Sequence, residues 1–204
     1  MKQVLVDYIG SIEITPAQIN ESMNKNNGKL IVSGIMQRAS DAGDKNFNQN
    51  GRSYPLNILK PECDKYKKEF ITERRALGEL DHPDSQVVNL ANVSHNVQDL
   101  WWQGNDLMGK IEILGTPSGN IAKELLKAGI RLGISSRGMG SVKELGEGKV
   151  EVQDDFEIVC WDLVSNPSTQ GAFMSPSLNE SVQRSTNKYS KVNSLITDII
   201  NVMQ

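Results

Sequence analysis

The chain has 204 residues, a length that suits one domain with a sizeable core and a tail. Its formal net charge of -3 argues against a general binder of nucleic acid or of anionic membranes, because such proteins usually carry a basic face. No apolar run approaches the roughly 20 residues that a membrane helix needs. We therefore expect neither nucleic acid nor a membrane as a partner.

The N-terminus and the cysteines both favour a protein of the reducing cytoplasm. The N-terminus reaches its first acidic residue, Asp7, too soon for a secretory signal peptide. The two cysteines, Cys63 and Cys160, lie far apart in dissimilar settings, so we expect no disulfide framework.

The first third of the chain contains one clear strand and one clear helix. Residues 1–27 are hard to assign, whereas residues 30–36 place apolar side chains on both faces of a predicted buried strand. Residues 41–54 predict a polar loop. Pro55 opens a helix with apolar residues three or four apart, although Pro61 leaves open a helix that starts only there.

The middle of the chain predicts strands. Residues 75–82 and 87–97 are each expected to form a strand, and Pro83 ends the first of them. Residues 97–114 predict a hairpin with its turn at residues 103–106.

The best-defined predicted element is the next helix. Thr116 and Pro117 are a favourable N-cap and first helical position, and Gly129 is a natural C-terminal stop. The expected buried stripe consists of Ile121, Ala122, Leu125 and Leu126.

The last third predicts strands followed by a detachable tail. Residues 132–142 carry two serines, and residues 150–164 follow the pattern of one long strand or a bulged pair. After residue 174 the composition shifts to Ser, Asn, Gln and Lys, until a short apolar-periodic helix near the end. We therefore expect one domain over residues 1–174, and a linker with a removable helical tail over residues 175–204.

The stretch Gly133–Gly140 (GISSRGMG) places two adjacent hydroxyls between glycines. Such a backbone can turn sharply and lets a substrate carbonyl approach closely. A serine there can act as a nucleophile if a base and an orienting acid reach it from elsewhere. Local sequence does not separate Ser135 from Ser136, although on a strand the two point to opposite faces.

Asp162 is the candidate orienting acid. It lies on the side of its predicted strand that otherwise carries apolar residues. Burying a carboxylate there costs several kcal/mol of stability unless it is paired and hydrogen-bonded. A histidine N–H would satisfy it, and so would a buried arginine such as Arg137 or a position at a sheet edge.

The chain has two histidines, so the list of candidate bases is short. His82 follows an inward-facing Leu80 at a strand end, whereas His95 lies inside a strand without catalytic neighbours and is assigned a structural role. A histidine hydrogen-bonded at a strand terminus is the structural alternative for His82. Its alternative orienting acids are Glu79, Asp81 and Asp84.

Neither a metal nor a cofactor is expected. The two histidines and two scattered cysteines match no zinc-ligand spacing. The glycine-rich stretch lacks the Gly-Lys-Ser/Thr ending of a phosphate-binding loop.

Several motifs at compatible spacing resemble those of the prohead core proteases of T-even-type tailed bacteriophages. The matching segments are Asn50–Pro55, Gly78–Pro83, Trp102–Asp106, Gly133–Ser141 and Asn166–Ser168. The likeness covers roughly residues 30–176. Because that family is related in fold to the herpesvirus assemblins, the resemblance implies an α+β protein, a small and mostly antiparallel β-barrel ringed by a few helices.

The resemblance also implies a serine endopeptidase. His82 matches the histidine of the Glu-Leu-x-His-Pro motif, and Ser135 matches the nucleophile, the first serine of Gly-x-Ser-Ser-Arg-Gly. Asp162 occupies the place of the third member, where the assemblins have a second histidine. His82 would take the Ser135 proton, Asp162 would hold the imidazole, and an acyl-enzyme would be hydrolysed. Backbone N–H groups near Arg137 and Gly138, with the Arg137 charge, are expected to serve the oxyanion.

Substrates and location follow from the same resemblance. Such enzymes cleave scaffold, core and capsid proteins inside the prohead, in the host bacterial cytoplasm, after Glu in (Leu/Ile)-x-Glu sites. The expected linker contains Leu178-Asn179-Glu180, so we expect self-cleavage between Glu180 and Ser181. Leu145-Gly146-Glu147 fits the same pattern, but a cut there would sever the strands that carry the triad. The sequence is compatible with a homo-oligomer but does not determine the oligomeric state.

Two other classes of function remain as alternatives. A non-catalytic prohead core or scaffold assembly protein can share the fold, since fold does not determine function. A cytoplasmic hydrolase of small esters is disfavoured because the chain lacks a Gly-x-Ser-x-Gly nucleophile elbow. The joint presence of His82, Ser135 and Asp162 favours the endopeptidase.

Overall fold

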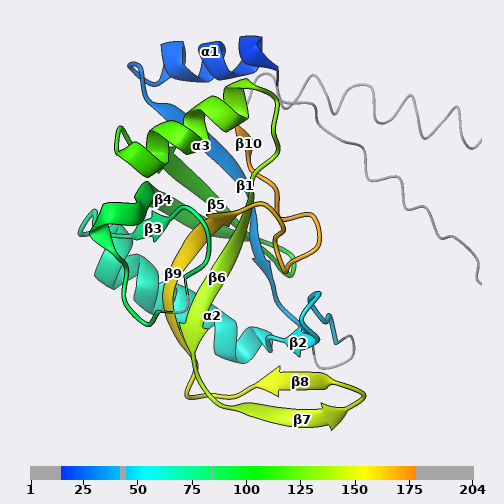
Figure 1. Cartoon of the computed structure of the whole chain (residues 1–204). Helices are drawn as coiled ribbons and strands as arrows, with labels where there is room; N and C mark the ends of the chain where they lie inside the picture. The colour runs from blue at the N-terminus through cyan, green and yellow to red at the C-terminus, as the bar shows by residue number, and fades with distance from the viewer. Residues whose placement is uncertain (1–14, 42–44, 84, 178–204) are drawn as a thin grey trace, which may run out of the picture.

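A computed structural model describes residues 15–41, 45–83 and 85–177 (Figure 1). The helices are α1 (Pro16–Lys25), α2 (Leu56–Tyr66) and α3 (Pro117–Lys127), with a π-helical turn at Lys67–Ile71 and a 3₁₀ turn at Leu90–Asn92. The strands are β1 (Leu30–Arg38), β2 (Arg52–Ser53), β3 (Leu77–Glu79), β4 (Val93–Gln103), β5 (Asp106–Ile113), β6 (Gly133–Met139), β7 (Val142–Gly146), β8 (Lys149–Val152), β9 (Glu157–Val164) and β10 (Ser175–Pro176). The protein is therefore α+β with mostly antiparallel strand pairs, as expected.

The strands form three sheets. Their orders are β10-β1-β5-β4-β3, β2-β8-β7 and β6-β9. A closed barrel is not found within the described residues, because single bridges rather than full ladders join the first sheet to the third. These bridges are Leu80↔Leu163 beside β3 and β9, and Gly133↔Phe173 at the start of β6. The barrel predicted from the resemblance is therefore not observed as a closed structure in the described residues.

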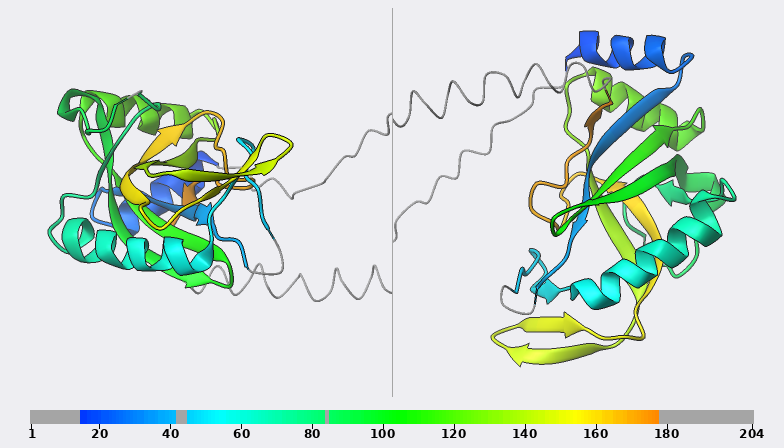
Figure 2. Two further views of the ribbon diagram at one scale, coloured as in Figure 1. Left: turned by 90° about the horizontal axis from the view of Figure 1, so that it is seen from below. Right: turned by 180° about the vertical axis from the view of Figure 1, so that it is seen from behind.

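The helices cover different parts of this framework. Helices α1 and α3 lie together at one end, and α2 lies toward the other end, beside the projecting β7–β8 hairpin (Figures 1 and 2). The fully buried Trp161 of β9 makes an edge-to-face contact with Tyr66 of α2, with ring centroids 4.9 Å apart. This contact anchors α2 behind the strand that carries Asp162. None of the described helices is long and apolar enough to cross a membrane.

Helix α2 is continuous, so the alternative start at Pro61 is not observed. Pro61 lies inside the helix and cannot donate the hydrogen bond that its position would otherwise make to the carbonyl four residues earlier. The apolar spacing nevertheless predicted the buried face correctly, since Leu59, Cys63 and Tyr66 are all buried. Packing of this face against the core outweighs the missing hydrogen bond.

Helix α3 has the predicted N-cap, with the Gly119 N–H donating to the Thr116 hydroxyl at 3.1 Å. Ala122 and Leu126 are buried as expected. The inclusion of Ile121 in the buried stripe was wrong, because this side chain is 55% exposed. The buried face of the helix is therefore narrower than the set of apolar residues in its sequence.

Two predicted strands differ from those observed. Residues 87–92 form a loop and a 3₁₀ turn rather than the start of a strand, and β4 begins only at Val93. The apolar side chains that suggested the strand, Val87 and Leu90, are 71% and 73% exposed. The strand expected over residues 75–82 is shorter, as β3 ends at Glu79.

The start of the described chain contains a helix that the prediction missed. Helix α1 begins with a capping box, in which the Gln18 N–H donates to the Thr15 hydroxyl at 3.3 Å and the Thr15 N–H donates to the Gln18 side chain at 2.8 Å. Thr15-Pro16 followed by Gln18 is a recognisable start signal. The helix has few apolar residues, and only Ile19 and Ser22 are buried, so its apolar repeat is too short to identify it.

The end of the described chain belongs to the main sheet. Strand β10 pairs with β1 just beyond the expected boundary at residue 174. The Glu180–Ser181 bond and the predicted tail helix lie outside the described residues.

Candidate active site

The β6–β9 pair separates the two candidate serines. Ser135 lies directly opposite Asp162, and Ser136 lies opposite Trp161. Opposite residues of antiparallel strands share a face, whereas successive residues point to opposite faces. Ser135 therefore shares the face of Asp162, whereas Ser136 lies on the face of the buried Trp161.

A turn at Asp81 places His82 against Asp162. The Asp81 N–H donates to the Leu163 carbonyl of β9 at 2.8 Å, and the Asp81 carboxylate accepts the backbone N–H of His82 at 2.9 Å. Asp81 has a φ of 69°, a left-handed conformation that aspartate tolerates better than most residues. Anchored in this way, the His82 ring has its Nδ1 2.7 Å from Asp162 Oδ2.

This contact gives the His82 ring a defined chemistry. A carboxylate that accepts a hydrogen bond from Nδ1 keeps the proton there and leaves Nε2 as an acceptor. The His82 side chain is 39% exposed, whereas Asp162 is fully buried. The ring therefore presents a basic nitrogen away from an enclosed carboxylate, which is the arrangement of a general base.

Asp162 is satisfied by several donors at once. Its Oδ1 accepts the Glu79 N–H at 2.9 Å, the Arg137 Nη2 at 3.2 Å and the Cys160 thiol at 3.3 Å. Burial by itself would raise the pKa of Asp162. The hydrogen bonds from His82 and Glu79 and the Arg137 charge outweigh burial, so its pKa is lowered and the carboxylate stays ionised.

Arg137 lies at the centre of a buried ion cluster. Its Nη2 is 2.7 Å from Glu79 Oε1 and its Nε is 2.9 Å from Asp162 Oδ2. Its Nη1 donates to the carbonyl of Ser85 at 2.9 Å and lies 3.4 Å from that of Val87. The guanidinium is therefore engaged inside the protein, which favours a donor other than its charge for the oxyanion.

Both partners considered for Asp162 are present together. The sequence offered a histidine or a buried arginine as alternatives, and the structure pairs the carboxylate with His82 and with Arg137. Of the alternative acids, Glu79 pairs with Arg137 and Asp81 contacts the His82 backbone rather than its ring. Asp84 lies outside the described residues.

Ser168 is a site neighbour that the sequence analysis did not single out. Its hydroxyl lies 3.2 Å from the hydroxyl of Ser135. The preceding Pro167 packs so closely on Gly133 that a β-carbon there would meet the proline ring at 2.5 Å. The Asn166–Ser168 motif was noted for its resemblance, and this contact places it beside the candidate serine Ser135.

A groove opens at His82 along the ends of β6 and β9. It has a volume of about 760 Å³ and is lined by His82, Pro83, Ser85, Gln86, Arg137, Gly138, Met139 and Val159. It adjoins an apolar hollow of about 400 Å³ that shares Gln86, Met139 and Val159. The exposed Val87 and Leu90 form part of this hollow, which explains why their apolar character does not indicate a buried strand.

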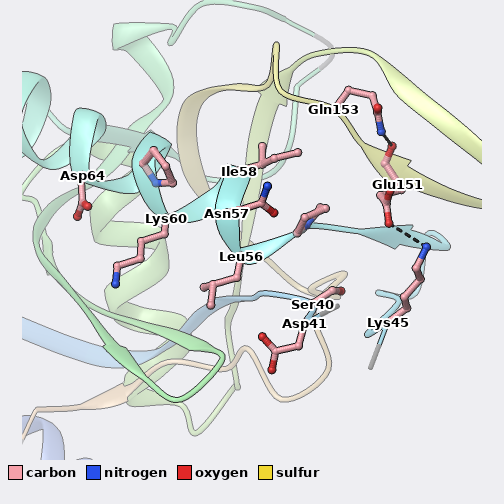
Figure 3. A pocket seen from close by; sticks show the side chains of 12 residues that line it. Ser40, Asp41, Lys45, Leu56, Asn57, Ile58, Lys60, Asp64, Glu151 and Gln153 are labelled. Carbon is pink, nitrogen blue, oxygen red and sulfur yellow. Dashed lines mark hydrogen bonds and ion pairs between the residues drawn. The ribbon is translucent and has the colours of Figure 1, made fainter. Parts of the chain in front are cut away.

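A larger cavity lies elsewhere (Figure 3). It has a volume of about 930 Å³ and is bounded by the first turns of α2, by Ser40 and by β8. An ion pair of 3.0 Å between Lys45 and Glu151 closes one rim. None of His82, Ser135 and Asp162 lines this cavity. We therefore locate the candidate active site by its chemistry rather than by cavity size.

His95 has the structural surroundings expected for it. It is fully buried, with Nδ1 2.9 Å from the Ser94 hydroxyl and Nε2 3.0 Å from the Trp161 carbonyl. Burial lowers the pKa of His95 to about 4. The described residues contain no group of three or more His, Cys, Asp or Glu side chains arranged to hold a metal ion.

The lowered pKa of His95 predicts a loss of stability in mild acid. Unfolding raises the pKa of His95 toward its ordinary 6.5, so the unfolded state binds the proton more readily below that pH. We expect the free energy of unfolding to fall by about 2 kcal/mol from pH 7.5 to pH 5 through this residue alone. Urea denaturation of the wild type and of His95→Gln measures it, because the variant lacks this titration. An equal pH dependence in both proteins would contradict the assignment.

Comparison with known proteins adds an independent observation. Residues 5–183 match the family described as prohead core protein serine protease. The chain belongs to this family. It is 33% identical over 151 residues to the prohead core protein protease of Enterobacteria phage T4, covering 72% of this chain and 68% of that protein.

A solved structure of the same kind supports the family fold. The bacteriophage T4 capsid assembly protease matches with a TM-score of 0.62 and 31% identity, over 68% of this chain and 84% of that one. The α+β fold of this prohead core protease is therefore shared with a solved relative. The T-even-type resemblance inferred from the motifs is confirmed.

Proposed function

We propose that the chain is a Ser-His-Asp endopeptidase of phage capsid maturation. Ser135 is the nucleophile, His82 the general base and Asp162 the orienting acid. The observation that carries the proposal is the 2.7 Å contact between His82 Nδ1 and Asp162 Oδ2, on the strand face that Ser135 shares. Membership of a serine protease family supports it.

In the proposed reaction, Ser135 Oγ forms a bond to the scissile carbonyl carbon and its proton passes to His82 Nε2. His82 then gives that proton to the leaving amine as the peptide C–N bond breaks. Water, deprotonated by the same nitrogen, hydrolyses the acyl-enzyme and restores Ser135. The Ser168 hydroxyl, 3.2 Å from Ser135 Oγ, is the side-chain donor that we propose for the oxyanion, in place of Arg137.

The proposed substrates are scaffold, core and capsid proteins of the prohead, cut after Glu in (Leu/Ile)-x-Glu sites. The relatives' names, which refer to the prohead core and to capsid assembly, support this substrate class. The place of action is the prohead interior in the host bacterial cytoplasm. We also propose that the sheets together form a small β-barrel ringed by the helices. We further propose that the chain cuts itself between Glu180 and Ser181.

The decisive experiment compares four purified chains: wild type, Ser135→Ala, His82→Ala and Ser136→Ala. Each is incubated alone and with a peptide containing one Leu-x-Glu site, followed by intact mass measurement. We expect the wild type and Ser136→Ala to cut the peptide and to release a fragment beginning at Ser181. Ser135→Ala and His82→Ala should lose at least about 10³-fold in rate, because each removes a group of one catalytic unit.

Two outcomes would contradict the proposal. Abolition by Ser136→Ala alone would move the nucleophile to the other face of β6. A wild type that assembles with prohead proteins but cuts neither itself nor the peptide would favour the non-catalytic assembly protein.

A further inference from the structure

A second, smaller pocket opens beside the strand of Ser135, and it shares no lining residue with the groove at His82. Its volume of about 60 Å³ suits a single side chain. The wall residues come from the end of β1, from the β2 region and from the segment after Ser168, and they are Arg38, Asn46, Phe47, Asn48, Arg52, Tyr54, Thr169 and Gln170.

One contact places this pocket next to the nucleophile. Ser168, whose hydroxyl is 3.2 Å from that of Ser135, directly precedes the wall residue Thr169. The wall residue Tyr54 lies beside Ser136, which points to the other face of β6. The pocket therefore adjoins the nucleophile through Ser168.

The position of His82 assigns the pocket to one side of the scissile bond. In the proposed mechanism His82 protonates the leaving amine, so its groove receives the part of the substrate that follows the cut. The pocket lies beside Ser168 rather than beside His82, and it shares no lining residue with the groove at His82. It is thus placed for the acyl side, which holds the residue immediately before the cut.

Of the two arginines that line this pocket, one has no carboxylate partner among the described residues. Arg38 is bound by Asp106, with Nε–Oδ1 at 2.5 Å and Nη2–Oδ2 at 3.2 Å. Lys149, at the neighbouring hairpin, lies 3.6 Å from Glu147. Within the described ranges, Arg52 has no carboxylate within ion-pair distance, and its side chain is exposed.

The backbone holds Arg52 firmly, and its side chain lies beside the Tyr54 hydroxyl without a described carboxylate partner. The Arg52 N–H donates to the Asn48 side chain at 3.0 Å, and β2 pairs with β8 at Arg52↔Val150. The preceding Gly51 has a φ of 69°, and a β-carbon there would meet the Gly148 carbonyl at 2.6 Å. Only glycine permits this close approach, so the Asn-Gly-Arg sequence fixes the arginine beside the pocket.

We propose that Arg52 binds an acidic side chain of the substrate in this pocket, and so determines the residue accepted before the cut. The inference rests on the proposed function and deepens it. A guanidinium offers paired N–H donors that match a carboxylate, and one without a carboxylate partner discriminates strongly between an acid and its amide. Tyr54 and Thr169 line the same pocket, and each carries a hydroxyl that can donate a hydrogen bond.

The test measures binding and cleavage with two peptides that differ only in Glu or Gln before the cut. Binding is measured by fluorescence anisotropy on Ser135→Ala chains, so that no peptide is consumed. Arg52→Gln should weaken binding of the Glu peptide roughly 10- to 100-fold and leave the Gln peptide nearly unchanged. In chains with Ser135 present, the same change should lower the Glu-to-Gln ratio of kcat/KM by a similar factor.

Arg131→Gln is the matched control. Arg131 is also exposed, but it lies over the Phe173 ring at 4.2 Å and lines none of the described pockets that include site residues. This change should leave both binding and the ratio unaltered. The charge reversal Arg52→Glu should in turn favour a peptide with Lys before the cut.

The outcomes separate the two proposals. Glu-over-Gln discrimination that survives Arg52→Gln, or a Ser135→Ala chain that binds neither peptide, would overturn the role of Arg52. Binding that depends on Arg52 in a chain that cuts nothing would support the pocket and overturn the proposed protease activity.

Discussion

Replacing Asp162 with Asn is expected to lower kcat for a Leu-x-Glu peptide by about 10⁴-fold while the protein stays folded. The amide no longer holds the proton on His82 Nδ1, so the ring can turn its basic nitrogen inward and lose its role as base. Folding is preserved because Arg137 keeps Glu79 as its partner, 2.7 Å away. The measurement is kcat by steady-state kinetics beside a urea unfolding curve.

Glu79→Gln is the matched control for this prediction. It removes the other carboxylate of the Arg137 cluster by the same acid-to-amide change, but Glu79 does not contact the His82 ring through its side chain. We expect a far smaller loss of kcat than for Asp162→Asn. Equal losses in the two variants would mean that Asp162 acts only through charge balance with Arg137, and not through the orientation of His82.

Elements with strong local signals could be predicted from the sequence. The Thr116-Pro117 cap and the hairpin of residues 97–114 were predicted correctly, because capping and turn formation depend on neighbouring residues. The loop of residues 87–92 was misassigned because its apolar side chains line an exposed hollow. Composition does not distinguish such a surface from a buried strand.

The candidate site was predictable only in part. The cost of burying Asp162 indicated that a partner must exist, and the resemblance singled out His82. The cluster of Arg137 with Glu79 was not predictable, because it joins residues 58 positions apart and depends on the register of strands. The contact of Ser168 with Ser135 likewise depends on a loop that returns to β6, which no local pattern shows.

The largest expected effect on stability comes from Arg137. Glu79 and Asp162 are both fully buried, and Arg137 is the cation that lies between them. Arg137→Gln leaves two buried carboxylates without that charge and frees the carbonyls of Ser85 and Val87. We expect the free energy of unfolding at neutral pH to fall by about 3–5 kcal/mol.

The pH dependence of this loss identifies its cause. In the wild type the pKa of Asp162 is lowered, so its stabilisation is present above the unfolded pKa and is lost as the pH falls through the folded pKa. Without Arg137, burial dominates and the pKa of Asp162 should rise above that of the unfolded chain. The folded variant then binds protons more readily than the unfolded chain. The difference in free energy of unfolding between the wild type and the variant should therefore shrink as the pH is lowered.

Urea denaturation at about pH 7.5 and about pH 5 measures this difference. Arg137→Lys should lose less stability than Arg137→Gln, since it keeps the charge but not the forked geometry that reaches Glu79, Asp162 and Ser85 together. Arg131→Gln should cost no more than about 1 kcal/mol, because that arginine is exposed and only stacks on Phe173. A deficit in Arg137→Gln that stays constant with pH would mean that lost packing, rather than uncompensated carboxylates, destabilises the variant. The ion cluster would then not be what keeps Asp162 charged beside His82.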